Sequence, residues 1–304
     1  MNNSQMCLRR VLVTGATGYI GSNLVARLVA EGWDVHIVVR PNSKLDVLKS
    51  VMSSITAHEH DGSTRSMINL VGQAKPEMVF HLASLFLAQH NYDDIEALIL
   101  GNLLFSTQLT EAIVSNDVKY LVNTGTSWQH YNNEEYNPVN LYAATKQAFE
   151  DILAFYIDAH NLKVMTLALF DTYGPNDFRS KLIHLLWKTA QTQEPLFMSP
   201  GEQLIDLVHI DDVLTAFVLA AKQLPGQNIG HARYGVSSGK PLRLIDLVAA
   251  FERATGCELP ITWGGRPYRA REVMIPWNNF QALPTWVPRI PFETGILQTR
   301  PVLI

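Results

Sequence analysis

The chain has 304 residues, of which 17% are charged, and its formal net charge is -4. No run of like charges occurs, which excludes a basic tail for nucleic acid and a polybasic patch for a membrane surface. Cys7 and Cys257 stand in no metal-binding or redox spacing, as in proteins of reducing compartments. The sequence has no apolar signal core and no run of about 18 apolar residues. We therefore expect a cytoplasmic protein that has neither nucleic acid nor a membrane as a partner.

A glycine-rich segment near the start of the chain predicts a dinucleotide site. The apolar run Val11–Val13 has the length of a buried strand, and Ser22–Ala30 has apolar residues at helical spacing. Gly15, Gly18 and Gly21 lie between them at every third position. A strand that enters a helix through spaced glycines lets backbone and a helix N-terminus approach a pyrophosphate. The residues expected to bind the cofactor here are Gly15, Thr17, Gly18, Tyr19 and Ile20.

The residue after the second predicted strand indicates which cofactor is used. Trp33–Val39 has the pattern of a parallel strand, and Arg40 follows it. NAD sites place a carboxylate about 20 residues beyond the glycines, whereas an arginine there accommodates the 2′-phosphate of NADP. The alternative is a solvated arginine at a strand end. Because a guanidinium pairs bidentately with phosphate, we expect NADP(H) in preference to NAD(H).

A third strand, Ile55–His60, ends at Asp61 and Gly62, where a carboxylate could bind the adenine amino group. His58 and His60 alternate on this strand, but no third metal ligand is spaced near them, so we interpret them as surface histidines. A fourth strand, Met78–Ser84, runs into a turn of small residues that can pass close to the cofactor. The contacts expected from that turn are Leu82, Ala83 and Ser84.

Strands and helices alternate along the first half of the chain, which predicts a doubly wound parallel sheet of the α/β class. The further elements expected there are a helix over Arg65–Lys75, a helix from about Tyr92 to Ser115, a strand over Tyr120–Asn123, a helix over Asn140–His160 and a strand over Val164–Leu169.

A tyrosine and a lysine at helical spacing supply candidate acid/base chemistry. Tyr142 and Lys146 are four residues apart, so they project from one face of the predicted helix. An ammonium near a phenol lowers the pKa of the phenol from about 10 and makes it a better acid/base near neutral pH. The same lysine can hold the ribose of the cofactor. Thr126 and Ser127 follow the fifth strand and offer a hydroxyl for a substrate oxygen.

Taken in order, these motifs resemble the extended short-chain dehydrogenase/reductase family, in its nucleotide-sugar epimerase, dehydratase and reductase branch. The segments that carry the resemblance are Gly15-Ala-Thr-Gly-Tyr-Ile-Gly21, Phe80-His-Leu-Ala83, Thr124-Gly-Thr126, Tyr142-Ala-Ala-Thr-Lys146, Phe170-Asp-Thr-Tyr-Gly-Pro175 and Asp206-Leu-Val-His-Ile-Asp-Asp-Val213. The resemblance implies a Rossmann-type fold and a catalytic set of Thr126, Tyr142 and Lys146, with Ser127 as the alternative hydroxyl. It also implies cofactor contacts from Tyr142, Lys146 and Phe170.

The chain departs from the family pattern at three places. Family dehydratases carry an Asp-Glu pair after the catalytic threonine, whereas this chain has Ser127-Trp128, so dehydration is not expected. Asp171 replaces the usual Asn, and Ile205 replaces an Arg that grips the diphosphate. Other groups must therefore bind the nucleotide-diphospho-sugar. The residues expected to do so are Ser84, Ser127, Asn176, Arg179, Lys181, Arg266, Arg269 and Arg271.

The segments around Phe170 and Asp206 are similar to those of CDP-abequose and CDP-paratose synthases, which are NADPH-dependent 4-ketoreductases of O-antigen sugar assembly. The resemblance thus implies reduction of a C4 ketone on a nucleotide-linked deoxysugar. One alternative is a UDP-glucose-type 4-epimerase with tightly held NAD, which Arg40 disfavours. The other is a non-catalytic NADP(H) sensor, which the Tyr142 and Lys146 pair disfavours.

The remaining third of the chain predicts a smaller lobe. We expect residues 1–170 to form the NAD(P)-binding domain and residues 171–304 a substrate-binding α/β lobe, with about 205–235 returning to the first domain. Asp211 and Asp212 stand at the start of a predicted helix, where they suit its dipole. No metal site is expected. Family likeness further implies a homodimer packed through the helices Tyr92–Ser115 and Asn140–His160.

Overall fold

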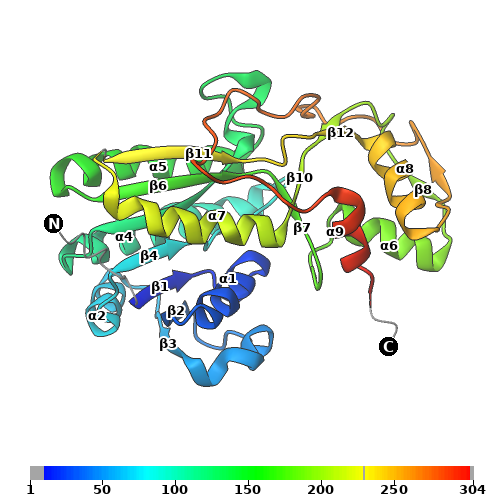
Figure 1. The fold of residues 1–304 in the computed structure, drawn as a ribbon. Helices are drawn as coiled ribbons and strands as arrows, with labels where there is room; N and C mark the ends of the chain where they lie inside the picture. Colours follow the sequence, from blue (N-terminus) through cyan, green and yellow to red (C-terminus); the bar gives the residue numbers. More distant parts are fainter. Residues whose placement is uncertain (1–9, 229, 302–304) are drawn as a thin grey trace. The chain divides into compact units, whose positions relative to one another are not determined.

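The computed structural model describes residues 10–228 and 230–301. Its largest sheet has seven strands (Figure 1). Its strands lie in the order β11-β6-β5-β4-β1-β2-β3, and the pairs β1–β2, β1–β4, β2–β3 and β4–β5 are parallel. The strands are β1 (Arg10–Thr14), β2 (Asp34–Val39), β3 (Ile55–Glu59), β4 (Met78–His81), β5 (Tyr120–Thr126), β6 (Lys163–Leu169) and β11 (His231–Val236). The order reverses between β1 and β4, and such a switch point is where ligands bind in open α/β sheets. The predicted doubly wound parallel sheet is confirmed.

Helices cover both faces of this sheet because its strands are apolar on both sides. On β4, Val79 packs into a cluster with α2, α4 and α5, whereas the next residue, Phe80, contacts Phe217 of α7. Right-handed crossovers then place α1 on the face opposite α4. The helices are α1 (Tyr19–Ala30), α2 (Thr64–Ala74), α4 (Phe105–Ser115), α5 (Leu141–His160) and α7 (Ile210–Gln223), with the short turns η1 (Asp46–Ser54) and η6 (Leu224–Gly226).

The predicted helix over residues 92–115 is interrupted. It consists of η2 (Tyr92–Asp94), α3 (Ile95–Ile99), the π-helical segment η3 (Leu100–Leu104) and α4. By length and composition this stretch could cross a membrane, a test that core helices of soluble proteins also pass. Leu109, Ala112 and Ile113 of α4 are fully buried in the sheet cluster, so this half of the stretch has the packing of a core helix.

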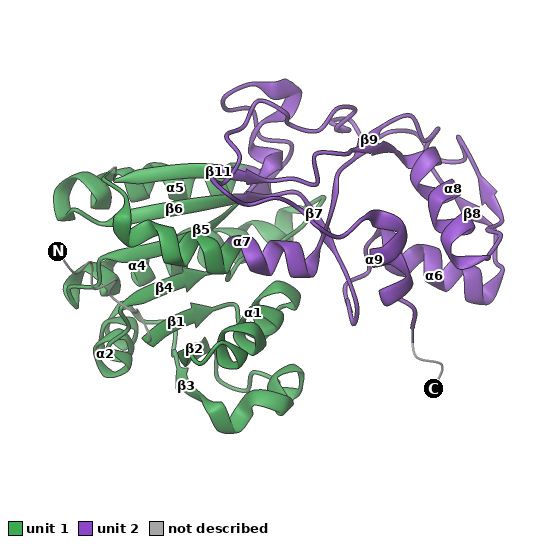
Figure 2. Cartoon of the chain, in the orientation of Figure 1, with its two compact units in different colours: residues 1–125, 144–167, 217–233 green, residues 126–143, 168–216, 234–304 purple. Residues whose placement is uncertain are grey.

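The chain divides into two compact units that interleave along the sequence (Figure 2). Unit 1 comprises residues 1–125, 144–167 and 217–233, and unit 2 comprises residues 126–143, 168–216 and 234–304. The elements of unit 2 are η4 (Ser127–Gln129), η5 (Tyr131–Asn133), β7 (Asp171–Tyr173), α6 (Leu182–Thr192), β8 (Leu196–Phe197), β9 (Leu204–Ile205), β10 (Leu207–His209), β12 (Leu242–Arg243), α8 (Leu244–Thr255), β13 (Ile261–Thr262) and α9 (Phe292–Gln298).

Unit 2 has its own apolar core, and its strands pair two by two as β10–β7, β12–β9 and β13–β8. Leu186 and Trp187 of α6, Leu247 and Phe251 of α8, and Ile296 of α9 are buried together. Trp277 and Trp286 are also buried. This half therefore folds around helices that bury an apolar face against one another, with short strand pairs at the edges.

The structure corrects the role expected of His60, and it adds a role for Asp212, which lies in the first turn of α7 as predicted. His60 was expected at the surface, but it is 4% exposed and its ring lies 5.5 Å from that of Phe105, because α4 covers this end of β3. Asp212 turns its carboxylate to the loop before α9, where it accepts the backbone N–H groups of Arg289 and Ile290 at 3.0 Å. Among the residues described, no group of three or more His, Cys, Asp or Glu could hold a metal. Cys7 lies outside the described residues.

Candidate functional site

The glycine turn between β1 and α1 has a backbone that tolerates no side chain at two positions. Gly15 has φ +71°, and a Cβ on it would lie 2.6 Å from the backbone nitrogen of Ala83. A Cβ on Gly21 would lie 2.0 Å from the carbonyl oxygen of Gly15. Gly18 is the N-cap of α1, which has no side-chain cap and no acidic residue in its first turn. A helix start of this kind suits a phosphate group, and the glycines allow its approach.

The exit of β4 is tied to this turn by a buried chain of hydrogen bonds. The Thr14 hydroxyl accepts the N–H of Ala83 at 3.2 Å and lies 2.8 Å from Nδ1 of His81. The other ring nitrogen of His81 lies 2.9 Å from the Ser106 hydroxyl on α4. Burial lowers the pKa of His81 to about 3, with a further contribution from Lys146. His81 is therefore a neutral structural bridge.

Asn102 of the π-helical segment η3 holds the next part of that loop. Its side-chain oxygen accepts the N–H of Leu85 at 2.7 Å and the Ser84 hydroxyl at 3.1 Å. Its amide nitrogen donates to the carbonyl of Leu85 at 3.0 Å and to the Thr145 hydroxyl at 2.9 Å. Asn102 thereby joins the loop that carries Leu82, Ala83 and Ser84 to helix α5.

The two residues expected at the ribose and the adenine both follow strand ends and are exposed. Arg40 begins a tight turn, in which its N–H donates to the Ser43 hydroxyl at 3.0 Å. No ion pair joins its guanidinium to a carboxylate within the described part of the chain. The Asp61 carboxylate accepts the N–H of Ser63 at 2.8 Å, a bond that lowers the pKa of Asp61. The neighbouring Gly62 has φ +97°, and Gln108 of α4 donates to its carbonyl at 3.0 Å.

Helix α5 carries both members of the predicted acid/base pair. Asn140 caps the helix by accepting the N–H of Ala143 at 2.9 Å. Tyr142 and Lys146 then lie one helical turn apart, and they are 9% and 4% exposed. Burial lowers the pKa of Lys146 to about 8, against the opposing effect of Glu150. The spacing of one helical turn places the lysine and the tyrosine on the same face of α5.

Thr126 and Ser127 lie where β5 ends, and both are 8% exposed. The Thr126 hydroxyl accepts the N–H of Trp128 at 3.3 Å, while Gln129 accepts the Thr126 N–H at 3.0 Å. This reciprocal capping begins the turn η4 and fixes the threonine side chain. Since the hydroxyl acts as an acceptor in that bond, its own proton can be donated to another oxygen.

Most of the expected diphosphate ligands are engaged with other side chains of unit 2. Arg179 donates twice to Asp177, at 2.7 Å each, and Lys181 lies 3.2 Å from Asp171. Arg266, Arg269, Arg271 and Asn176 lie at exposed positions of loops, Asn176 with φ +56°. Arg269 pairs with Glu272. Arg271 lies over the ring of Tyr131 and donates a hydrogen bond to Asn137. The phosphate ligands thus fall on two separate loops.

Phe170, expected at the cofactor, belongs to an aromatic cluster of unit 2. Its ring is nearly parallel to that of Trp277 at 6.4 Å and lies 5.4 Å from Phe280. Trp277 in turn stacks on His130 at 3.8 Å. The sequence motif around Phe170 did not identify these partners, because they follow it by more than a hundred residues.

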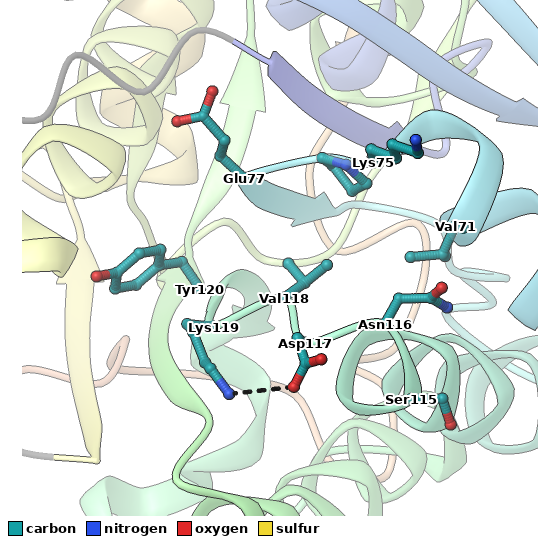
Figure 3. Close-up of a pocket in the computed structure, with 11 residues that line it drawn as sticks. Val71, Lys75, Glu77, Ser115, Asn116, Asp117, Val118, Lys119 and Tyr120 are labelled. Atoms are coloured by element: carbon teal, nitrogen blue, oxygen red, sulfur yellow. Dashed lines mark ion pairs between the residues drawn. The ribbon is translucent and has the colours of Figure 1, made fainter.

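One hollow of about 590 Å³ lies where strands β4 and β5 begin, at the end of the sheet away from the glycine turn (Figure 3). It is lined by the last residues of α2 and α4 and by residues that precede β4 and begin β5, including the Lys119–Asp117 ion pair of 3.8 Å. None of the expected site residues lines it. Ligands of doubly wound sheets bind at the carboxyl ends of strands, so this hollow is not the candidate site.

Sequence reasoning missed His81, Asn102, Glu150 and Arg233. The motif Phe80-His-Leu-Ala83 contained His81 without assigning it a role. Asn102, Glu150 and Arg233 are recognisable as special only after folding, because each is a polar side chain brought against distant residues in a buried setting.

Comparisons with known proteins agree with this arrangement. The family model described as "NAD dependent epimerase/dehydratase family" matches residues 11–231. A CDP-abequose synthase from Salmonella muenchen is 24% identical over 291 residues, which cover 95% of this chain and 96% of that protein. A UDP-glucose 4-epimerase from Mycolicibacterium smegmatis is 28% identical, with 95% and 97% covered. The solved UDP-glucose 4-epimerase of Thermotoga maritima with UDP-glucose has a TM-score of 0.83 at 22% identity, with 96% and 97% covered, which shows the common fold.

Proposed function

Because the chain belongs to the NAD-dependent epimerase/dehydratase family, we propose that it is an NADPH-dependent 4-ketoreductase of nucleotide sugars. The substrate is a nucleoside-diphospho-4-keto-6-deoxyhexose or its 3,6-dideoxy analogue, and the setting is deoxysugar or surface-polysaccharide assembly in the bacterial cytoplasm. The observation that carries the proposal is the buried Tyr142 one turn before the buried Lys146 on α5.

The reduction needs a proton donor at the ketone oxygen, and Tyr142 has that role. The dinucleotide supplies hydride to C4 when it is bound. Thr126 donates a hydrogen bond to the ketone oxygen, and Tyr142 gives its phenolic proton to the same oxygen as negative charge develops there. Lys146 stabilises the resulting phenolate and holds the nicotinamide ribose. Donors fixed before the reaction cost little reorganisation when the charge appears.

The cofactor assignment rests on two features of unit 1. Gly15 and Gly21 allow the turn to pack closely on Ala83 and on α1, whose N-terminus has no side-chain cap and can receive a pyrophosphate. The exposed guanidinium of Arg40 can pair with a 2′-phosphate. Structures of related epimerases hold NAD, as in the Thermus thermophilus UDP-glucose 4-epimerase, so preference for NADP(H) is a feature proposed for this chain.

Ser127 and Trp128 support reduction over dehydration, because they stand where family dehydratases have an acid and a base. The similarity to CDP-abequose synthase supports a cytidine nucleotide.

Arg269 and Arg271, on an exposed loop, are proposed as diphosphate ligands. Lys181 is proposed as a third, with the phosphate replacing Asp171 as its ionic partner. Asn176, Arg179, Ser84 and Ser127 complete the proposed substrate contacts.

A 4-epimerase is the second candidate, and the similarity to the Mycolicibacterium smegmatis enzyme favours it.

The proposed reductase is tested by NADPH oxidation with CDP-, dTDP- and UDP-4-keto-6-deoxyhexoses, followed by NMR of the product. We expect stoichiometric oxidation with one of them, at a rate that falls about a hundredfold or more in Tyr142→Phe. Protein that retains NAD and interconverts UDP-hexoses without added reductant would support the epimerase instead. Intact NADPH binding with no turnover of any sugar would support a sensor.

A further inference from the structure

Three charged side chains from two elements of unit 1 form a cluster: Lys146 and Glu150 of α5, and Arg233 of β11. Glu150 follows Lys146 by one turn of α5, and both are 4% exposed. Arg233 of β11 donates through Nε to Oε2 of Glu150 at 2.9 Å and through Nη2 to the same oxygen. A carboxylate this deeply buried is stable only when it is paired and hydrogen-bonded. The cluster therefore has one negative charge between two positive ones.

The other titratable groups that face this cluster are neutral near pH 7. Burial and the positive charge of Lys146 lower the pKa of His81 on β4 to about 3. Burial lowers the pKa of His231 on β11 below its usual value, while the nearby charges of Glu150 and Arg233 act on it in opposite directions. Its Nε2 lies 3.0 Å from the Thr166 hydroxyl of β6. Glu150 is thus the anionic group that acts on the Lys146 ammonium within this cluster.

We infer that Glu150, clamped by Arg233, is a positioning residue that keeps the Lys146 ammonium charged in its buried site. The two side chains share one face of α5, where groups four residues apart are neighbours, and their burial leaves the attraction little screened by solvent. Without the carboxylate, no anionic group of this cluster would offset the burial of the ammonium. Lys146 would then lose its proton at a lower pH, and above that pH Tyr142 would have no cationic neighbour. The consequence for catalysis rests on the proposed function, whereas the charge of Lys146 does not.

The direct test is the titration of Lys146 itself, followed by NMR in protein labelled with ¹³Cε-lysine, its signal assigned by absence from Lys146→Arg. In E150Q we expect the midpoint to fall by about one pH unit or more, because one unit corresponds to about 1.4 kcal/mol of lost attraction. In R233M we expect the midpoint to rise, since Glu150 then interacts with Lys146 alone. A merely structural role would not move the two midpoints in opposite directions.

Should E150Q fold poorly, the charge-free pair E150Q/R233M provides a second measurement, with a midpoint expected between those of the wild type and E150Q. E150D is expected to restore most of the wild-type value. Equal midpoints in the wild type, E150Q and R233M would overturn the inference.

The pH profile of NADPH-dependent reduction provides the catalytic readout. We expect the alkaline limb of kcat/KM to move to lower pH in E150Q, with a loss of about tenfold above pH 8 and little loss near pH 6, as a shift of one unit implies. If no sugar is reduced by the wild type while the NMR midpoints move as expected, the proposed function fails and the inference stands. If the wild type reduces the sugar and the E150Q profile is unchanged, the inference fails.

Discussion

Tyr142 and Lys146 have the central roles in the proposed chemistry, and each can be tested singly. In Tyr142→Phe the proton donor is lost while the ring that packs in the site is kept. We expect kcat to fall about a hundredfold or more, the contribution typical of general acid catalysis, with a much smaller effect on the Kd for NADPH. Stopped-flow reduction and fluorescence titration of NADPH measure the two quantities. Full turnover in this variant would remove Tyr142 from the mechanism.

His81 predicts a specific dependence of stability on pH. Its pKa is about 3 in the fold against 6.5 unfolded, so the unfolded chain binds the extra proton first and stability falls as pH drops from 6.5 toward 3. At pH 5 this group alone should cost about 2 kcal/mol relative to pH 7. Urea unfolding of the wild type and His81→Gln at both pH values measures it.

The variant is expected to be less stable at pH 7, because the bonds to Thr14 and Ser106 are weakened. The free energy of unfolding of the variant should nevertheless fall less between pH 7 and pH 5 than that of the wild type. An equal loss in both proteins would show that His81 takes up a proton in the folded state.

At the scale of elements, α1 packs so closely on the glycine turn that one added methyl group at Gly21 should destabilise the fold. Gly21→Ala would place a Cβ 2.0 Å from the Gly15 carbonyl oxygen. We expect a loss of about 1–3 kcal/mol in the free energy of unfolding, as for other overpacked sites, together with weakened NADPH binding. Gly226→Ala is the control, because a Cβ there meets no atom within 4 Å. Equal effects of the two substitutions would contradict the account.

The stretch from α3 to η3 presents apolar side chains that the described part of unit 1 leaves uncovered. Ile95, Ile99, Leu100 and Leu104 are 43%, 40%, 55% and 45% exposed. Exposed apolar patches of this kind mark interaction surfaces, and we propose that a second copy of the chain covers this one. Leu100→Glu/Leu104→Glu is expected to turn a dimer into a monomer in analytical ultracentrifugation, whereas Val47→Glu, at a position of similar exposure, is not. A wild-type monomer would refute the proposal.

Sequence reasoning predicted the regular elements of unit 1 well. Strands β1 to β6 and helix α5 have strong periodicity and clear turns, so local pattern and tertiary structure agree. The break at η3 could not be predicted, because it follows from the bonds of Asn102 to Leu85 and Thr145 across the fold. The pairing of Arg179 with Asp177 is equally invisible in a sequence. The burial of His60 depends on where α4 packs.

For the whole molecule, the choice of cofactor should depend on a single guanidinium. In Arg40→Asp a carboxylate replaces the group that pairs with the 2′-phosphate. We expect the Kd for NADPH to rise about tenfold or more, the scale of a lost charge-assisted pair, while that for NADH is unchanged or falls. Lys49→Asp makes the same charge change at another exposed position of unit 1 and should leave the ratio of the two constants unaltered. Parallel loss of both nucleotides in Arg40→Asp would contradict the assignment.

The central claim is that a ketone at C4 of a nucleotide sugar receives hydride from NADPH, with Tyr142 as the proton donor. The most direct measurement uses (4-²H)NADPH, labelled on each face of the ring in turn, with CDP-4-keto-6-deoxyhexose and NMR of the product. The account predicts that one of the two labelled forms places deuterium at C4, one atom for each NADPH oxidised, and that Tyr142→Phe places almost none. Conversion of the sugar with no deuterium at C4 from either form would contradict it.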